Sequence, residues 1–155
     1  MATWEMRPNP RPSKLFLMAT GLHNATNIQR TPSMRVLVTF EDIRSVYRDV
    51  FVRAICDLRP TLPVRSASLC ELERAFERFD PHVVVSSQPS EVSAAGCSAW
   101  VHIPTDDGLQ DDERLAEICL DGEHWRTDGP PLSELLAVID EAQERLREGS
   151  LSGSC

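Results

Sequence analysis

The first half of the chain alternates between two hydrophobic patterns. Val36–Phe40 and Val83–Val85 are almost continuously apolar and rich in β-branched residues, which is typical of strands buried on both faces of a sheet. Arg44–Arg59 and Leu69–Phe79 carry apolar residues at helical spacing, which predicts two amphipathic helices. A shorter strand is expected over Pro63–Ala67. Strands that alternate with helices in this way predict a parallel sheet.

The second half is less regular. Ala99–Pro104 is a predicted strand, Ala116–Arg126 indicates a hairpin around Asp121-Gly122, and Leu132–Leu146 has the clearest helical periodicity of the chain. A parallel crossover normally needs about a dozen residues or more, usually helical. Because only a loop leads from the strand at 99–104 to the hairpin, we expect the later strands to turn antiparallel. The predicted fold is a doubly wound α/β domain with a mostly parallel central sheet.

Composition suggests three segments. Residues 1–33 hold four of the 11 prolines and show no sustained periodicity, which predicts a disordered N-terminal arm. The alternative is that Met34 is the biological start and the arm is a translation-start artefact. The folded domain is expected over residues 34–147, followed by a flexible tail at 148–155. Since no effector domain is expected after the last helix, any output would come from partner binding.

The formal net charge of −8 is distributed unevenly along the chain. Residues 34–155 carry 12 arginines against 23 acidic residues, a net charge of −11, and contain no lysine. This negatively charged segment repels phosphate backbones, so no nucleic-acid partner is expected. A basic protein or a cation could still bind to it. No apolar run approaches the roughly 18 residues that a membrane-spanning helix needs, so no membrane partner is expected.

The five cysteines show neither a metal-site pattern nor a disulfide pattern. They are odd in number and contain no C-x-x-C pair, which argues against a zinc site and against a disulfide framework. Cys56, Cys70 and Cys119 stand next to apolar positions. We interpret them as buried free thiols, consistent with a reducing, cytoplasmic compartment.

Candidate functional residues follow the predicted parallel strands, because ligands of open α/β sheets bind outside the carboxyl ends of the strands. Glu41 and Asp42 follow the first strand and are candidate magnesium ligands; the alternative is that Asp42 caps the next helix. Ser86 and Ser87 end the third strand, where they would bind a phosphate or satisfy local backbone groups. Thr105 follows the fourth. No G-x-G-x-x-G, Walker or G-x-S-x-G motif is present.

Two stretches resemble the receiver domain of two-component response regulators. M-R-V-L-V-T-F-E-D at 34–42 is similar to the receiver's first strand and its terminal acid pair. F-D-P-H-V-V-V-S-S-Q-P at 79–89 is similar to the run that ends at the receiver's phosphoacceptor aspartate. On this alignment Ser87, or Ser86 if the strand slips by one residue, stands at the aspartate's position. Thr105 corresponds to the family's Thr or Ser after the fourth strand.

The resemblance covers about residues 34–88 and implies a three-layer, flavodoxin-like fold with reduced helices after strands three and four. Phosphoryl transfer to a receiver requires a carboxylate nucleophile, bound magnesium and a lysine, and two of these three parts are missing here. It therefore implies a degenerate receiver: a non-enzymatic signalling or protein-interaction module without a cofactor, with an unidentified protein partner or a second copy of itself. One alternative is a magnesium-dependent enzyme or small-molecule-binding domain using the acidic residues at the strand ends. The other is a purely structural or oligomer-forming domain that associates through the helix at 132–146.

Overall fold

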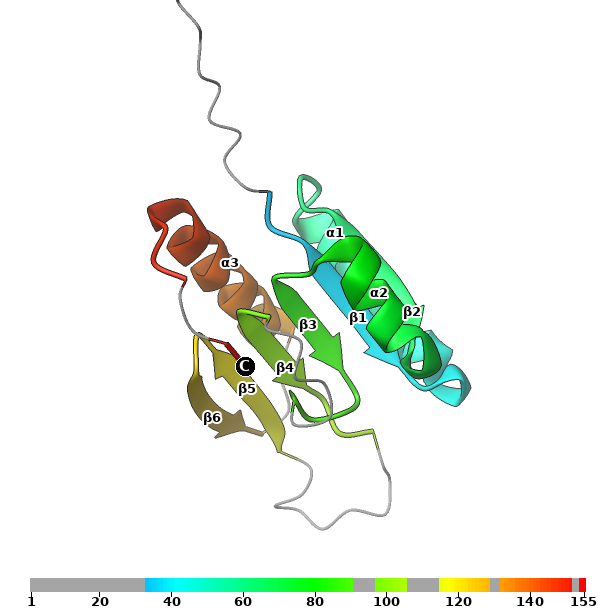
Figure 1. The fold of residues 1–155 in the computed structure, drawn as a ribbon. Helices are drawn as coiled ribbons and strands as arrows, with labels where there is room; N and C mark the ends of the chain where they lie inside the picture. Colours follow the sequence, from blue (N-terminus) through cyan, green and yellow to red (C-terminus); the bar gives the residue numbers. More distant parts are fainter. Residues whose placement is uncertain (1–32, 91–96, 106–114, 129–131, 152–153) are drawn as a thin grey trace, which may run out of the picture. The chain divides into compact units, whose positions relative to one another are not determined.

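The computed structural model describes residues 33–90, 97–105, 115–128, 132–151 and 154–155 (Figure 1). Apart from Ser33, the expected arm at 1–33 lies outside these residues, as do the loops at 91–96 and 106–114, where reduced helices were expected. The first half folds as predicted, with two 3-10 turns, Asp42–Arg44 and Leu69–Glu71, leading into the helices. Its elements are β1 (Val36–Phe40), α1 (Ser45–Leu58), β2 (Val64–Ser68), α2 (Leu72–Phe79) and β3 (Val83–Ser86).

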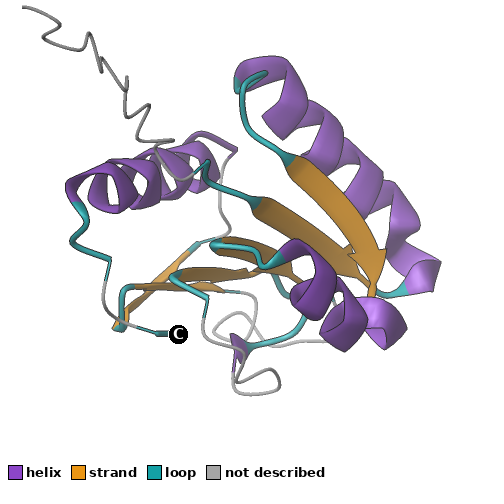
Figure 2. Ribbon diagram, turned by 45° about the horizontal axis from the view of Figure 1, so that its top comes forward, coloured by secondary structure: helices purple, strands orange, loops and turns teal. Residues whose placement is uncertain are grey.

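The second half completes one six-stranded sheet in the order β2-β1-β3-β4-β5-β6 (Figures 1 and 2). Strands β1 to β4 are parallel, whereas β5 and β6 run antiparallel to their neighbours. The predicted α/β fold with a mixed sheet is therefore confirmed. The remaining elements are β4 (Ala99–His102), β5 (Ala116–Leu120), β6 (Glu123–Thr127) and α3 (Leu132–Glu148).

The hairpin between β5 and β6 forms where the sequence predicted it. Asp121 and Gly122 adopt φ angles of 53° and 86°. A two-residue turn with positive φ at both positions matches the twist of the flanking strands, which is why the Asp-Gly pair predicts it.

Helices cover both faces of the sheet. The alternation of side chains along β1 places Val36, Val38 and Phe40 on the face that carries α1 and α3, and Leu37 on the face that carries α2. On the first face the core includes Ile55 from α1 and four fully or nearly fully buried residues of α3: Leu135, Val138, Ile139 and Ala142. On the second face, Phe76 of α2 stacks on Trp100 of β4 with ring centroids 6.3 Å apart. Both clusters exclude water from large apolar side chains, which is the main stabilising contribution to such a domain.

Only part of the apolar surface of α1 is buried against the sheet. The helix forms as expected and packs on β1 and β2, but Ile55 is its one fully buried residue. Val46, Tyr47 and Val50 are 71%, 51% and 59% exposed. The apolar residues of α1 span a wider arc than the sheet surface can cover. Phe51 and Val52 therefore pack against the core, and the others face outward.

The interpretation of the cysteines was also wrong. Cys119 and Cys155 form a disulfide across a sequence separation of 36, and Cys56 and Cys70 are exposed rather than buried. Cys97 is a buried free thiol, and burial raises its pKa to about 11. The backbone N–H of Cys155 donates to the carbonyl of Cys97 at 3.0 Å, which holds the end of the chain beside β5. Sequence spacing carries no signal for this contact because the sheet alone creates it.

None of the described helices is long and apolar enough to cross a membrane.

Candidate functional site

The strand order reverses between β1 and β3, because β1 leads outward to β2 whereas β3 leads to β4 on the other side. In open α/β sheets, ligands bind at such a reversal, outside the carboxyl ends of the strands. Two of the predicted site residues lie here. Glu41 directly follows β1 and Ser87 directly follows β3, and the backbone N–H of Ser87 donates to the carbonyl of Thr39 at 3.3 Å. We call this region the strand-end site.

The two serines of the strand-end site have different surroundings. Ser86 is fully buried, and its Oγ accepts a hydrogen bond from the backbone N–H of Gln88 at 3.0 Å. Ser86 therefore satisfies a local backbone group, as the second interpretation of the sequence proposed. The Oγ of Ser87 and the Oγ1 of Thr39 are buried and find no hydrogen-bond partner among the described residues. A buried hydroxyl without a partner costs about 1–3 kcal/mol, so these two oxygens make the site polar without being required for the local fold.

The two acidic residues proposed as magnesium ligands have different surroundings. Asp42 is mostly exposed and lies 3.9 Å from Arg48, while one carboxylate oxygen of Glu41 is buried without a hydrogen-bond partner in the described part of the chain. Neither the 3-10 turn nor α1 after it has a side-chain cap hydrogen bond, so Asp42 does not cap the following helix. Among the described residues, no three His, Cys, Asp or Glu side chains group as metal ligands. Magnesium usually takes one or two carboxylates plus waters or phosphates, so a magnesium site at Glu41 and Asp42 stays a prediction.

The end of β4 adds His102, which was not among the candidate residues singled out from the sequence. The backbone N–H of Ile103 donates to the carbonyl of Ser86 at 2.7 Å, which joins β4 to the strand-end site. Burial lowers the pKa of His102, while a hydrogen bond to the Ser87 backbone and the carboxylate of Glu117 oppose that shift. The imidazole is therefore biased to the neutral form and engages the backbone of Ser87. Its place on the final residue of a parallel strand was the available signal.

Thr105 is half-buried beyond the end of β4. The acidic residues that follow it, Asp106 and Asp107, lie outside the described residues. The structure thus brings Glu41, Ser87 and His102 to one edge of the sheet.

The indole of Trp100 fixes the chain after β3. Its Nε1 donates to the carbonyl of Gln88 at 2.8 Å, and its ring stacks on Phe76. This bond ties the backbone at Gln88 to β4, next to the strand-end site.

A second feature lies on α1 and the 3-10 turn before it. Four apolar side chains, which we call the α1 stripe, are spaced so that they share one helical face and are all exposed: Ile43, Val46, Tyr47 and Val50. Ile43 is 91% exposed. Contiguous exposed apolar side chains of this kind mark interaction surfaces more often than scattered ones do.

No protein-family model, curated protein or solved structure matches this chain. The resemblance to receiver domains therefore depends on the residues quoted above.

Proposed function

We propose that this protein is a non-enzymatic, receiver-like module with a flavodoxin-like, three-layer fold, which works by protein–protein contact and is not phosphorylated by the usual aspartyl route. Support comes from the strand-end site, where the resemblance to receivers aligns Ser87, or Ser86, with the phosphoacceptor aspartate. Serine needs an adjacent base to act as a nucleophile. Here the imidazole of His102 is bonded to the backbone of Ser87, and residues 34–155 contain no lysine.

The observation that carries the proposal is the α1 stripe. Its four side chains lie outside the core although the chain could have placed polar residues at these positions without cost to the sheet. Removing apolar surface from water on association is favourable by about 25 cal/mol per Å². The function is therefore assigned to the outer face of α1 rather than to the strand ends.

The occupant we propose for the α1 stripe is a second copy of this chain, with the two helices antiparallel. If the pair is centred between Val46 and Tyr47, Ile43 of one copy lies opposite Val50 of the other. Asp42 and Arg53 are separated by about three helical turns and so flank the stripe on the same side. In the antiparallel pair, Asp42 of one copy then lies within about 3 Å along the axis of Arg53 of the second copy. Both side chains are largely exposed, so the surface is self-complementary in charge as well as apolar.

The α3 helix is a weaker candidate for self-association. Its apolar residues are buried against the sheet and are not available to a second copy.

Sedimentation equilibrium of the full chain over a wide concentration range tests this proposal. We expect a weak monomer–dimer equilibrium, because four side chains cover less than a standard interface. Val50→Arg should abolish the dimer. Leu58→Arg is the matched control: it changes another exposed apolar residue of α1, beyond the stripe, and should leave the dimer unchanged.

A charge swap tests the antiparallel arrangement separately. Asp42→Arg should weaken the dimer by placing like charges together, and adding Arg53→Asp to the same chain should restore it. Circular dichroism checks that each variant is folded. A wild-type protein that is monomeric at every concentration, or a Val50→Arg variant that still dimerises, would refute the self-association.

The magnesium-dependent alternative predicts a different result. A ligand that binds the folded state raises the melting temperature by mass action. We expect magnesium with beryllofluoride, an acyl-phosphate mimic, to leave the melting temperature unchanged. A magnesium-dependent rise that disappears in Asp42→Ala would favour a working ligand site at the strand ends.

A further inference from the structure

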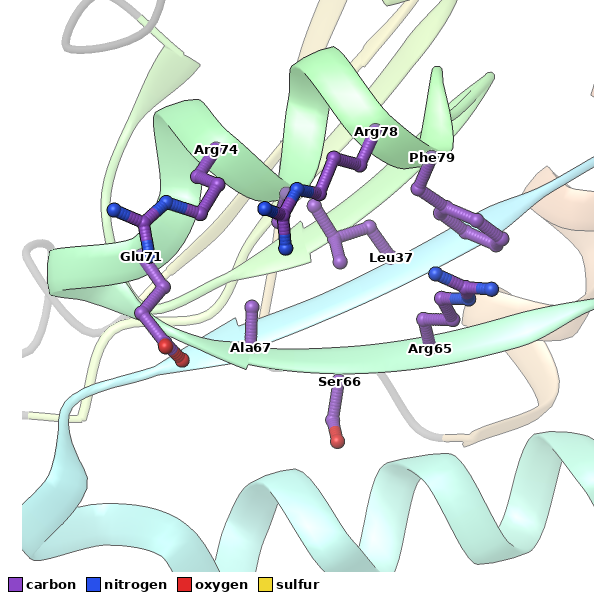
Figure 3. A pocket seen from close by; sticks show the side chains of 9 residues that line it. Leu37, Arg65, Ser66, Ala67, Glu71, Arg74, Arg78 and Phe79 are labelled. Carbon is purple, nitrogen blue, oxygen red and sulfur yellow. The ribbon is translucent and has the colours of Figure 1, made fainter.

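A pocket of about 160 Å³ lies between α2 and the edge strand β2, away from both the strand-end site and the α1 stripe (Figure 3). Its floor is apolar and includes Leu37, Ala67 and Phe79, which belong to the core on this face of the sheet. A cavity of about 150 Å³ with apolar walls is large enough to hold a benzene ring. The floor can therefore take a small apolar body.

Three arginines line the same pocket: Arg65 from β2, and Arg74 and Arg78 from α2. The guanidinium of Arg65 lies 5.0 Å from the centre of the Phe79 ring, in cation–π contact that fixes its position. Figure 3 shows the guanidinium of Arg78 directed over Leu37 and Ala67. The guanidinium N–H donors therefore lie beside the apolar floor of the pocket.

These arginines stand out because none of them forms an ion pair with an acidic residue that the structure describes. Seven of the 11 described arginines form ion pairs within the described part of the chain: Arg35, Arg48, Arg53, Arg59, Arg126, Arg145 and Arg147. Of the four that do not, three line this pocket, and the fourth is Arg44. The pocket is thus a locally positive site on a body with a net charge of −11.

The spacing of two of these arginines on α2 also favours an anion site. Arg74 and Arg78 are four residues apart on one helix, where like charges repel, and neither forms an ion pair with a described carboxylate. Glu71 is the one acidic residue of the lining, and its carboxylate accepts a hydrogen bond from the Ser68 hydroxyl at 3.3 Å. In Figure 3 this carboxylate points away from Arg78. An anion bound between the guanidinium groups would remove the repulsion.

We propose that this pocket binds a small organic anion, in which a carboxylate or phosphate monoester group is joined to a single ring or a short apolar chain. The planar guanidinium groups match the paired oxygens of such a head group and form charge-assisted hydrogen bonds with it. The apolar floor receives the body of the ligand. The three-arginine pocket is thus a ligand site independent of the α1 stripe.

Isothermal titration calorimetry of the full chain with benzoate and with phenyl phosphate tests this proposal and distinguishes the two head groups. We expect one of the two probes to bind saturably at one site per chain. Benzyl alcohol has the ring without the charge and inorganic phosphate has the charge without the ring, so both should bind at least about tenfold more weakly.

Arg78→Gln and Arg65→Gln should each weaken the binding about tenfold or more, because each removes a charge-assisted hydrogen bond. Arg44→Gln is the matched control, since Arg44 lacks an ion pair with a described residue but lies outside the pocket, and should bind the probe as the wild type does. Circular dichroism confirms that the variants are folded. The proposal is overturned if neither probe binds saturably at millimolar concentration. Equal loss in Arg44→Gln, or inorganic phosphate binding as tightly as phenyl phosphate, would also overturn it.

Discussion

The disulfide between Cys119 and Cys155 offers the sharpest test of how the end of the chain is held. Cys155→Ser removes the cross-link while leaving the sheet and helices in place. The bond closes a loop with a sequence separation of 36. In the chain-entropy treatment, a loop of this length stabilises the folded state by about 4 kcal/mol at 25 °C, and measured values commonly lie at about 2–4 kcal/mol. The total stability of a domain is typically about 5–15 kcal/mol, so the variant should lose a large share of it.

Urea denaturation followed by circular dichroism measures this loss. The wild-type protein should unfold at lower urea concentration when a reductant is present, and Cys155→Ser should unfold there with or without reductant. Cys56→Ser is the control, because Cys56 is an exposed free cysteine, and it should change the free energy of unfolding by less than about 0.5 kcal/mol.

A thiol count supplies the complementary observation. Cys56 and Cys70 are exposed, whereas Cys97 is buried and burial raises its pKa to about 11, so a thiol reagent should label two cysteines in the native protein. If reductant leaves the urea midpoint unchanged, or if the native protein exposes three or more reactive thiols, the disulfide does not form and the reasoning fails.

Two further predictions concern buried polar contacts. The backbone N–H of Arg35 donates to Nδ1 of His82, and burial followed by the Arg35 charge lowers the pKa of His82 below 6.5. The unfolded chain then binds more protons, so this contribution to stability is complete above pH 6.5 and is lost as the pH falls through the lowered pKa. As the pH is lowered through this range, the denaturation midpoint should therefore decrease more steeply in the wild type than in His82→Asn. Equal slopes for the two proteins would contradict the lowered pKa of His82. Trp100→Phe removes the hydrogen bond to Gln88 and leaves a small cavity, and chemical denaturation should show a loss of about 2–3 kcal/mol; an unchanged midpoint would show that the bond and the packing contribute nothing.

The sequence was informative where burial depends on local pattern. The continuous apolar run of β1 and the Asp121-Gly122 turn each identify their structure without knowledge of the rest of the fold. The strand ends then follow, which is why Glu41 and Ser87 were correctly placed at one edge of the sheet.

Contacts between residues that are distant along the chain could not be predicted from the sequence. Periodicity located α1, but the extent of the neighbouring sheet decides which part of its wide apolar arc is buried, and Val46 and Val50 remained outside. The contact of Cys119 with Cys155 depends on where the end of the chain returns. Arg65 and Arg78 belong to different elements and form one pocket only because α2 packs over β2.

Sedimentation equilibrium of the full chain, with and without magnesium and beryllofluoride, tests the central claim most directly. If the protein acts through the α1 stripe and its strand-end site lacks receiver chemistry, a monomer–dimer equilibrium should be present and should not respond to the acyl-phosphate mimic. A protein that stays monomeric, or that dimerises only when magnesium and beryllofluoride are added, would contradict the account.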